Sequence, residues 1–285
     1  MQKKNYVKGR IINMNDENKY YKNISKEVRA DIIKMINFTH MGHPGSSLSC
    51  VEILVALYFK IMKIKTCLPN WKDRDRFILS KGHASPALYS VLARRGFFKL
   101  SLLNTFRQTN SSLTAYPDID TIGIDMEAGS LGNGLSTGVG MALSAKYNKQ
   151  NYFTYVLLGD GELEEGMIWE AAMCAAHHKL NKLVAIVDKN GLQIRGKVSE
   201  IMNIEPIKDK WSAFGWNVVE IDGHDYKQIF DAFEKVNYMK DKPTVIIANT
   251  IKGKGVSFME NNPEWHRHDI DDLQKKKALK EIMEG

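Results

Sequence analysis

Apolar residues recur along this chain with the two spacings that distinguish helices from buried strands. Between residues 24 and 40 they return every three or four positions, which predicts one buried helix face. The next helix is expected to open at Ser49, because Glu52 three residues later completes a capping-box pattern. Further helices are predicted from Ser136 onward, at 164–179, near residue 211 and at 225–236.

Strands are predicted where apolar residues occupy both faces of a short segment. Such segments alternate with the helices, which is typical of a parallel sheet covered on both sides. The expected fold class is therefore α/β, a doubly wound and mostly parallel sheet with an extended helical N-terminal part. We divide the chain into a basic tail (1–24), the domain proper (25–268) and a charged C-terminal helix (269–285). The predicted strands are 152–158, 181–190, 217–223 and 243–250.

Composition narrows the class of protein. With 44% hydrophobic and 26% charged residues, the 285-residue chain can bury a core. Its apolar runs are too short to span a bilayer, and its N-terminus lacks the apolar stretch of a secretory signal. Three cysteines without a CxxC pair favour buried thiols in a reducing compartment, so we expect a cytoplasmic protein.

The net charge of +7 raises the question of a nucleic-acid partner. Lysine and arginine are dispersed, however, and only "QKKKALK" near the C-terminus forms a dense run, which indicates a solvated helix face. A basic surface that attracts phosphorylated small molecules explains the charge equally well. We therefore expect neither a nucleic-acid nor a membrane partner.

One acidic cluster contrasts with this basic composition. In "LLGDGELEEG", residues 157–166, an apolar run stops at Gly159, and Asp160 begins a series of four carboxylates within six residues. In a doubly wound sheet, ligands bind outside the carboxyl ends of the strands. Asn190 lies at the carboxyl end of the next predicted strand, about 30 residues later, which leaves room for one crossover connection. If the two strands are neighbours, Asp160 and Asn190 face the same crevice.

This arrangement supplies hard oxygen ligands. The Asp160 carboxylate, the Asn190 amide oxygen and the Leu192 backbone carbonyl suit Mg²⁺ or Ca²⁺, completed by water and phosphate oxygens. The glycines on either side of Asp160 let the backbone approach a phosphate closely. The alternative is a solvated acidic turn without a ligand.

Two rival phosphate motifs are weaker. "GLQIRGKV" at 191–198 nearly spells a P-loop, but Val198 stands where a Ser or Thr hydroxyl is needed for Mg²⁺. "GNGLSTG" departs from GxGxxG at Thr137 and does not follow a clear strand, which argues against a dinucleotide site.

Taken in order, the motifs carry a resemblance to a known family. "GDG" at 159–161 followed by Asn190 is similar to the thiamine-diphosphate fingerprint, and residues 25–268 resemble the N-terminal, diphosphate-binding half of transketolase. One such motif is weak, whereas the ordered set is specific. The set comprises "GHPGSSLS", "LSKGHASPALYS", "GSLGNGLSTGVGMA", "GDGELEEG", "DKNGLQIRG", "IDGHD" and "KGKGVSFME".

The resemblance implies roles for particular residues. It implies that Asp160 and Asn190 bind the metal through their side chains and Leu192 through its backbone oxygen. Thiamine diphosphate and Mg²⁺, or Ca²⁺, are the implied cofactors. The other implied cofactor-binding residues are His83, Gly129, Ser130, Leu131, Gly161, Glu165, Ile194 and His266.

Three histidines are the implied catalytic residues. His83 matches a histidine near the diphosphate, and His43 and His266 match histidines that contact substrate and cofactor. Their Gly-containing loops favour a functional role for His43 and His83. Glu165 and Glu170 match acids at the contact between subunits. We interpret His177, His178, Asp222 and His224 as structural.

The resemblance implies a transferase that moves a two-carbon ketol unit from a ketose phosphate to an aldose. The family's full chain is more than twice as long, and its second half carries the pyrimidine-binding domain that is absent here. In a two-chain transketolase, a separate partner chain supplies that half, and a two-plus-two heterotetramer is expected. The alternatives are a specialised ketol-transferase, a P-loop hydrolase, a regulatory or scaffolding protein, and the α-type subunit of a 2-oxo-acid dehydrogenase.

One position departs from the family pattern. The family commonly has a histidine before a proline that reaches the donor substrate, and "LTAYPDID" keeps Pro117 but replaces the histidine with Tyr116. A phenol donates a hydrogen bond but is a poor proton carrier at neutral pH. The hypothesis is an altered substrate preference, and the alternative is that Tyr116 only packs.

Overall fold

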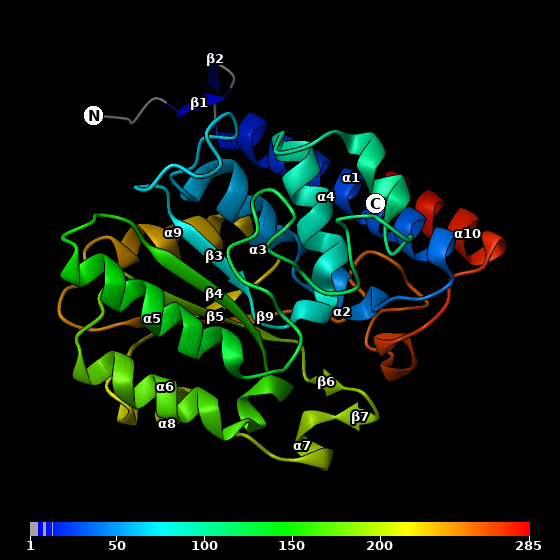
Figure 1. Ribbon diagram of the computed structural model, residues 1–285. Helices are drawn as coiled ribbons and strands as arrows, with labels where there is room; N and C mark the ends of the chain where they lie inside the picture. The colour runs from blue at the N-terminus through cyan, green and yellow to red at the C-terminus, as the bar shows by residue number, and fades with distance from the viewer. Residues whose placement is uncertain (1–4, 8–9, 13) are drawn as a thin grey trace.

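Five parallel strands form the centre of the molecule. The computed structural model describes residues 5–7, 10–12 and 14–285, with side chains from residue 16 onward. The sheet has the order β3-β4-β5-β9-β8, and all neighbouring strands are parallel (Figure 1). This confirms the predicted α/β class and adds β3, which the sequence analysis missed. The strands are β3 (Arg76–Leu79), β4 (Thr154–Gly159), β5 (Leu183–Lys189), β8 (Asn217–Asp222) and β9 (Thr244–Asn249).

Helices cover both faces of the sheet, as a doubly wound fold requires. Side chains alternate along β4, so that Tyr155 and Leu157 enter one apolar cluster while Val156 and Leu158 enter the other. α5 (Asn133–Tyr147), α6 (Gly166–His177) and α8 (Ile207–Ala213) lie along one face (Figure 1). The opposite face packs against α3 (Val51–Ala56), α4 (Ser85–Arg95) and α9 (Tyr226–Val236).

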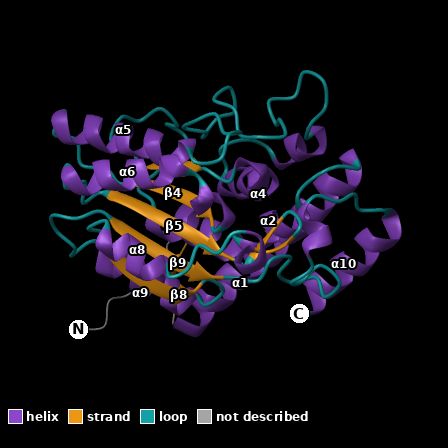
Figure 2. Ribbon diagram, turned by 90° about the horizontal axis from the view of Figure 1, so that it is seen from below, coloured by secondary structure: helices purple, strands orange, loops and turns teal. Residues whose placement is uncertain are grey.

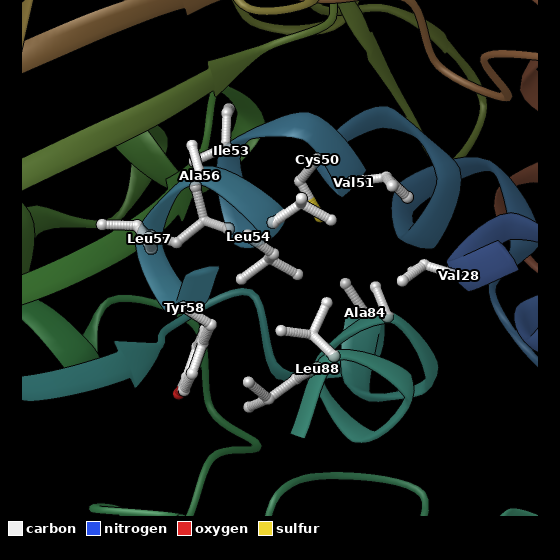
Figure 3. Packing of buried hydrophobic residues seen from close by; sticks show 14 of the residues in the cluster. Val28, Cys50, Val51, Ile53, Leu54, Ala56, Leu57, Tyr58, Ala84 and Leu88 are labelled. Atoms are coloured by element: carbon white, nitrogen blue, oxygen red, sulfur yellow. The ribbon is translucent and has the colours of Figure 1, made fainter. Parts of the chain in front are cut away.

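A helical layer extends the second face away from the sheet. α1 (Met14–Thr39) packs against α4 and α10 (Asp272–Glu284), at one side of the molecule (Figures 1 and 2). Figure 3 shows the core that joins them, where Val28 of α1, Leu54 of α3 and Leu88 of α4 converge. Part of the predicted tail, 1–24, lies outside the described residues, and α1 begins within it at Met14.

None of the helices in the described ranges is long and apolar enough to cross a membrane. Of the three free cysteines, Cys50 is buried as expected, Cys174 is half-buried and Cys67 is exposed, so the prediction of buried thiols is wrong for Cys67. Short elements complete the chain. They are β1 (Asn5–Val7), β2 (Arg10–Ile12), α2 (Pro44–Ser49), a π-helical turn (Leu57–Ile61), β6 (Leu192–Gln193), β7 (Gly196–Lys197), α7 (Val198–Ile201) and 3₁₀ turns at Gly82–Ala84, Leu100–Thr105, Gly161–Glu164 and Pro263–His266.

The predicted capping box at Ser49 is wrong. Ser49 ends α2, Cys50 occupies the cap position of α3, and no side chain caps that helix. The Ser49 hydroxyl donates instead to the Asp188 carboxylate at 2.6 Å, and the Glu52 carboxylate pairs with Arg29 at 2.7 Å. Charge-assisted partners from distant segments outweigh the local pattern, because a bond to an ionised group is stronger than a neutral one.

α5 begins at Asn133, three residues before the predicted start at Ser136, and its glycines explain why it can lie so close to the sheet. A Cβ atom at Gly134 would overlap the Ser80 hydroxyl oxygen. A Cβ atom at Gly138 would come within 2.6 Å of a Val156 methyl carbon. The glycine-rich segment therefore brings the start of α5 against the carboxyl edge of β3 and the face of β4.

Candidate active site at the carboxyl edge of the sheet

The turns after β4 and β5 meet at one edge of the sheet. The two strands are hydrogen-bonded neighbours, with Gly159 opposite Asp188, as the metal-site prediction required. Asp160 follows β4 directly and Asn190 follows β5 directly. The Gly191 N–H donates to Asp160 Oδ2 at 2.5 Å, so the two turns are in contact.

Asp160 is a buried carboxylate with little compensation for its charge. The side chain is 3% exposed, and in the described part of the chain its oxygens accept only the N–H groups of Gly161 and Gly191. Burial, followed by repulsion from the nearby Asp188 carboxylate, raises the pKa of Asp160 to about 6. A carboxylate in this condition fits a site that receives a cation.

In each of the other two candidate metal ligands, the oxygen atom already accepts a hydrogen bond. Asn190 Oδ1 accepts the Leu192 N–H at 3.1 Å, which leaves one lone pair of the amide oxygen. The Leu192 carbonyl accepts from Lys252 Nζ at 3.1 Å, so it already faces a positive charge. The described residues contain no group of three or more His, Cys, Asp or Glu side chains that could hold a metal. One carboxylate, one amide and one carbonyl therefore suit a hard cation whose remaining ligands come from water or a phosphate.

The three candidate histidines converge beside this edge. Their ring centroids are 5.1 Å apart for His43 and His83, 5.5 Å for His43 and His266, and 5.3 Å for His83 and His266. They come from segments far apart in sequence: the residue before α2, the turn after β3, and the 3₁₀ turn at residues 263–266.

These histidines are neutral. Burial and then the nearby arginines lower the pKa of His43 to about 4, and burial followed by Lys252 lowers that of His266 to about 3. Burial and then Lys81 lower the pKa of His83 well below its usual value. His266 Nδ1 is buried without a hydrogen-bond partner in the described structure, which is rare in a folded protein unless a ligand completes it. The cluster therefore has unused hydrogen-bonding capacity.

Two buried lysines connect the histidines with the aspartate edge, and the sequence analysis missed both. Lys81 forms an ion pair with Asp188 and is 1% exposed. Lys252 is also 1% exposed, and burial followed by repulsion from Lys81 lowers its pKa to about 8. Both lie inside motifs that the resemblance used, "SKGH" and "KGKG", but no local pattern reveals that they are buried.

The remaining candidate residues lie around this edge with different exposures. Gly129 and Ser130 are exposed just before α5, and Leu131 is half-buried. Gly161 donates its N–H to Asp160. Glu165 precedes α6 and packs 3.0 Å from the Cβ position at Gly132.

Three predicted residues do not enter the histidine cluster. Ile194 is 67% exposed at the turn between β6 and β7, and Glu170 is exposed on α6. Tyr116 is 41% exposed, and its ring lies 3.3 Å from the Cβ position at Gly82, next to His83. These three side chains therefore lie outside the histidine cluster, and only that of Tyr116 is next to a histidine-bearing turn.

The P-loop alternative is wrong. Residues 192–193 and 196–197 pair as the two strands of an antiparallel hairpin, and the helix after them has four residues. A P-loop instead wraps a phosphate between a strand and the N-terminus of a longer helix. "GNGLSTG" starts α5 without a strand directly before it, in agreement with the absence of a dinucleotide motif.

Comparison with known proteins identifies similar chains. Residues 20–282 match the family model described as "Transketolase, thiamine diphosphate binding domain". An apulose-4-phosphate transketolase subunit of Phocaeicola vulgatus is 43% identical over 260 residues, covering 91% of this chain and 92% of the relative. The 6-deoxy-6-sulfo-D-fructose transketolase subunit SqwG of a Clostridium species is 44% identical, covering 90% and 93%.

Longer proteins match over less of their own length. Human transketolase is 37% identical to this chain, and the match covers 92% of this chain and 42% of human transketolase. The crystal structure of transketolase from Campylobacter jejuni superposes with a TM-score of 0.86 at 34% identity, covering 95% of this chain and 43% of that one. The chain thus spans nearly all of the relatives that are named as subunits and less than half of these two longer proteins.

Proposed function

The chain belongs to the family of transketolase thiamine diphosphate binding domains, and we propose that it is one subunit of a two-chain enzyme that transfers a ketol unit between sugars. The observation that carries this proposal is the buried Asp160 carboxylate in contact with the Asn190 turn, beside three converging neutral histidines. A 2-oxo-acid dehydrogenase subunit is disfavoured, because the relatives of equal length are named as transketolase subunits.

The donor set fits thiamine diphosphate held through Mg²⁺. In the proposed holoenzyme, Asp160 and Asn190 bind the metal through their side chains and Leu192 through its carbonyl. The backbone at Gly161 and the exposed segment 129–131 lie against the cofactor. When bound, the cofactor supplies the nucleophilic carbon that makes and breaks the carbon–carbon bond.

The histidines provide hydrogen bonding and proton transfer to the substrate. Because His43, His83 and His266 are held neutral, each imidazole has one donor and one acceptor nitrogen at neutral pH. The unpaired Nδ1 of His266 is available to a hydroxyl or carbonyl of the ligand. Lys252 adds positive charge where anionic groups of the cofactor are expected.

A second chain with the pyrimidine-binding half completes the proposed enzyme. Three relatives of equal length are named as single subunits of transketolases, which implies a partner chain in those proteins. Glu165 and Glu170 are exposed and open to a partner. A two-plus-two heterotetramer follows from the usual closed symmetry of oligomers, and we place it in the cytoplasm.

The test is reconstitution. The purified chain with thiamine diphosphate and Mg²⁺ should show no ketol transfer from a ketose phosphate to an aldose, and adding the pyrimidine-domain chain should restore it. Full activity of the isolated chain contradicts the two-chain proposal. Absence of thiamine diphosphate binding in the reconstituted complex, measured by calorimetry, contradicts the cofactor assignment.

Substrate preference is proposed to depend on Tyr116, whose ring lies beside the turn that carries His83. The similar chains include subunits of enzymes for a sugar phosphate and for a sulfonated sugar, so preference varies within this group. Tyr116→His should raise kcat/KM for xylulose 5-phosphate if the phenol restricts the ordinary donor. An unchanged value in an already efficient enzyme means that Tyr116 only packs.

A further inference from the structure

A buried carboxylate between α1 and α3 has partners that the proposed function does not use. The two helices pack against each other (Figure 1), and both oxygens of Glu52 on α3 pair with the guanidinium group of Arg29 on α1, at 2.7 and 2.8 Å. The Nδ1 atom of His224, in the turn after β8, lies 2.9 Å from the same carboxylate. Burial opposes ionisation, but Arg29 and then His224 lower the pKa of Glu52 to about 2.

The other ring nitrogen of His224 faces the loop after β9, residues 250–255. The Ile251 N–H donates to His224 Nε2 at 2.9 Å, so Nε2 carries no proton. The proton of the neutral ring is therefore on Nδ1, which donates it to Glu52. The Glu52 carboxylate thus fixes the tautomer of His224 that can accept the Ile251 N–H.

Arg29 holds the same loop at a second point. Its Nε donates to the Lys254 carbonyl at 2.9 Å. A Cβ atom at Gly255 would lie 2.9 Å from Arg29 Cδ, so a larger residue there would displace the arginine. Through its two partners, the Glu52 carboxylate therefore supports one contact before Lys252 and one contact after it.

Between these two contacts the loop carries the Lys252 ammonium into the site. Lys252 is buried, and its Nζ donates to the Leu192 carbonyl at 3.1 Å. The next residue, Gly253, has φ of +80°, and its N–H donates to Gly45 O in α2 at 3.0 Å. The ammonium of a lysine is a point charge on a flexible stem, so the backbone from which the stem starts decides where the charge can lie. A loop that is held on both sides fixes that backbone.

We propose that Glu52 and His224 are positioning residues, which hold Lys252 in place for the anionic groups of the cofactor. The inference rests on the proposed function and deepens it. Both residues act through the backbone of the loop after β9. In "IDGHD", Asp222 shapes the turn by accepting the His224 N–H at 2.8 Å, and the histidine side chain then serves the site.

Two amide variants of His224 separate its two hydrogen bonds, and both leave the pair of Arg29 and Glu52 intact. The amide of Gln reaches the position of Nε2, so His224→Gln keeps an acceptor for the Ile251 N–H. The shorter amide of Asn reaches only the position of Nδ1, so His224→Asn keeps a donor for Glu52 and loses that acceptor. His177→Asn, at the exposed end of α6, is the matched control.

Hydrogen exchange and trypsin report on the loop directly in the isolated chain. His224→Asn should raise the exchange rate of the Ile251 amide about tenfold, because this N–H loses its acceptor. Trypsin should cleave after the buried Lys252 faster by a similar factor. His224→Gln and His177→Asn should stay within about twofold of the wild type in both measurements. Equal losses in the two His224 variants, or no loss in His224→Asn, overturn the proposal.

A double-mutant cycle decides whether His224 acts through Lys252. In the reconstituted complex with Mg²⁺, titration calorimetry should show that His224→Asn binds thiamine diphosphate about fivefold more weakly than the wild type. In a Lys252→Met background the same substitution should have no further effect, because the charge that it positions is already gone. Equal weakening in both backgrounds overturns the proposal. If the wild-type complex does not bind thiamine diphosphate, the proposed function fails, and the exchange and trypsin results still decide whether His224 holds the loop.

Discussion

Asp160 and Asp188 stand at the ends of neighbouring strands, and both are almost completely removed from water. Their partners differ. Asp188 binds the ammonium of Lys81 and the hydroxyls of Ser49 and Thr250, and although burial opposes it, Lys81 holds the pKa of this carboxyl below its usual value. Asp160 accepts two backbone N–H groups, and its pKa rises to about 6.

The difference shows how the same side chain serves structure in one place and chemistry in another. A buried charge whose partners are complete fixes the elements that supply them, here α2, the turn after β3 and the turn after β9. A buried charge whose partners do not fully compensate it costs stability in the empty protein and returns it when a cation binds. Such locally unfavourable groups concentrate at functional sites.

The largest effect on stability is expected from breaking the buried ion pair of Lys81 and Asp188. Asp188→Ala leaves the Lys81 ammonium buried and unpaired, so the free energy of unfolding should fall by about 3–5 kcal/mol. Urea denaturation of the cofactor-free chain measures this. The double variant Lys81→Met/Asp188→Leu removes both charges and should be clearly more stable than Asp188→Ala. If it is equally unstable, the pair is not the reason for the loss.

The opposite sign is expected at Asp160. Asp160→Asn removes a buried charge, which favours the folded cofactor-free chain because each pKa unit corresponds to about 1.4 kcal/mol. The amide keeps only one oxygen for the N–H groups of Gly161 and Gly191, and the lost acceptor offsets part of this, so the net gain should be about 0.5–2 kcal/mol. The same variant should lose Mg²⁺-dependent thiamine diphosphate binding, because the one charged metal ligand is gone. Scanning calorimetry and titration calorimetry give the two results. A variant that binds the cofactor normally contradicts the metal-site assignment.

The stability that Asp160→Asn gains over the wild type should decrease as the pH falls. The pKa of Asp160 is about 6 in the folded chain and near 3.8 when unfolded, so the folded state binds the proton more tightly. The cost of the carboxylate is therefore fully present above about pH 6 and disappears as the pH falls toward about 4. The difference in unfolding free energy between Asp160→Asn and wild type should shrink over this interval. A difference independent of pH shows that the substitution acts through something other than charge.

The smallest effect is expected at Leu192, which contributes only its backbone oxygen. Leu192→Ile keeps that carbonyl and the acceptor for Lys252 Nζ, so the affinities for Mg²⁺ and thiamine diphosphate should stay within about twofold. Calorimetry beside Asp160→Asn provides the comparison. A loss as large as that of Asp160→Asn means that the side chain at 192 shapes the site.

The local sequence determined most of the strands and, at the candidate site, the positions of the Asp160 and Asn190 turns. The apolar segments predicted four of the five strands. β4, β5 and β9 are apolar almost throughout because both of their faces are buried, whereas the edge strand β8 is only partly buried. β3 was missed, since its four residues, Arg76–Leu79, are too short to show a period. That the Asp160 and Asn190 turns lie at the same edge followed from the rule that parallel strands end at one edge, and the structure shows that the two strands are neighbours.

Only the tertiary structure decided which charged side chains lie next to one another around this edge of the sheet. Lys81 and Asp188 are 107 residues apart, and Lys252 reaches Leu192 across 60 residues, so no periodicity links them. A short pattern specifies the conformation of a few adjacent residues. The partners of a charge depend on how distant elements pack, and that packing sets which charges are compensated and which are left for a ligand.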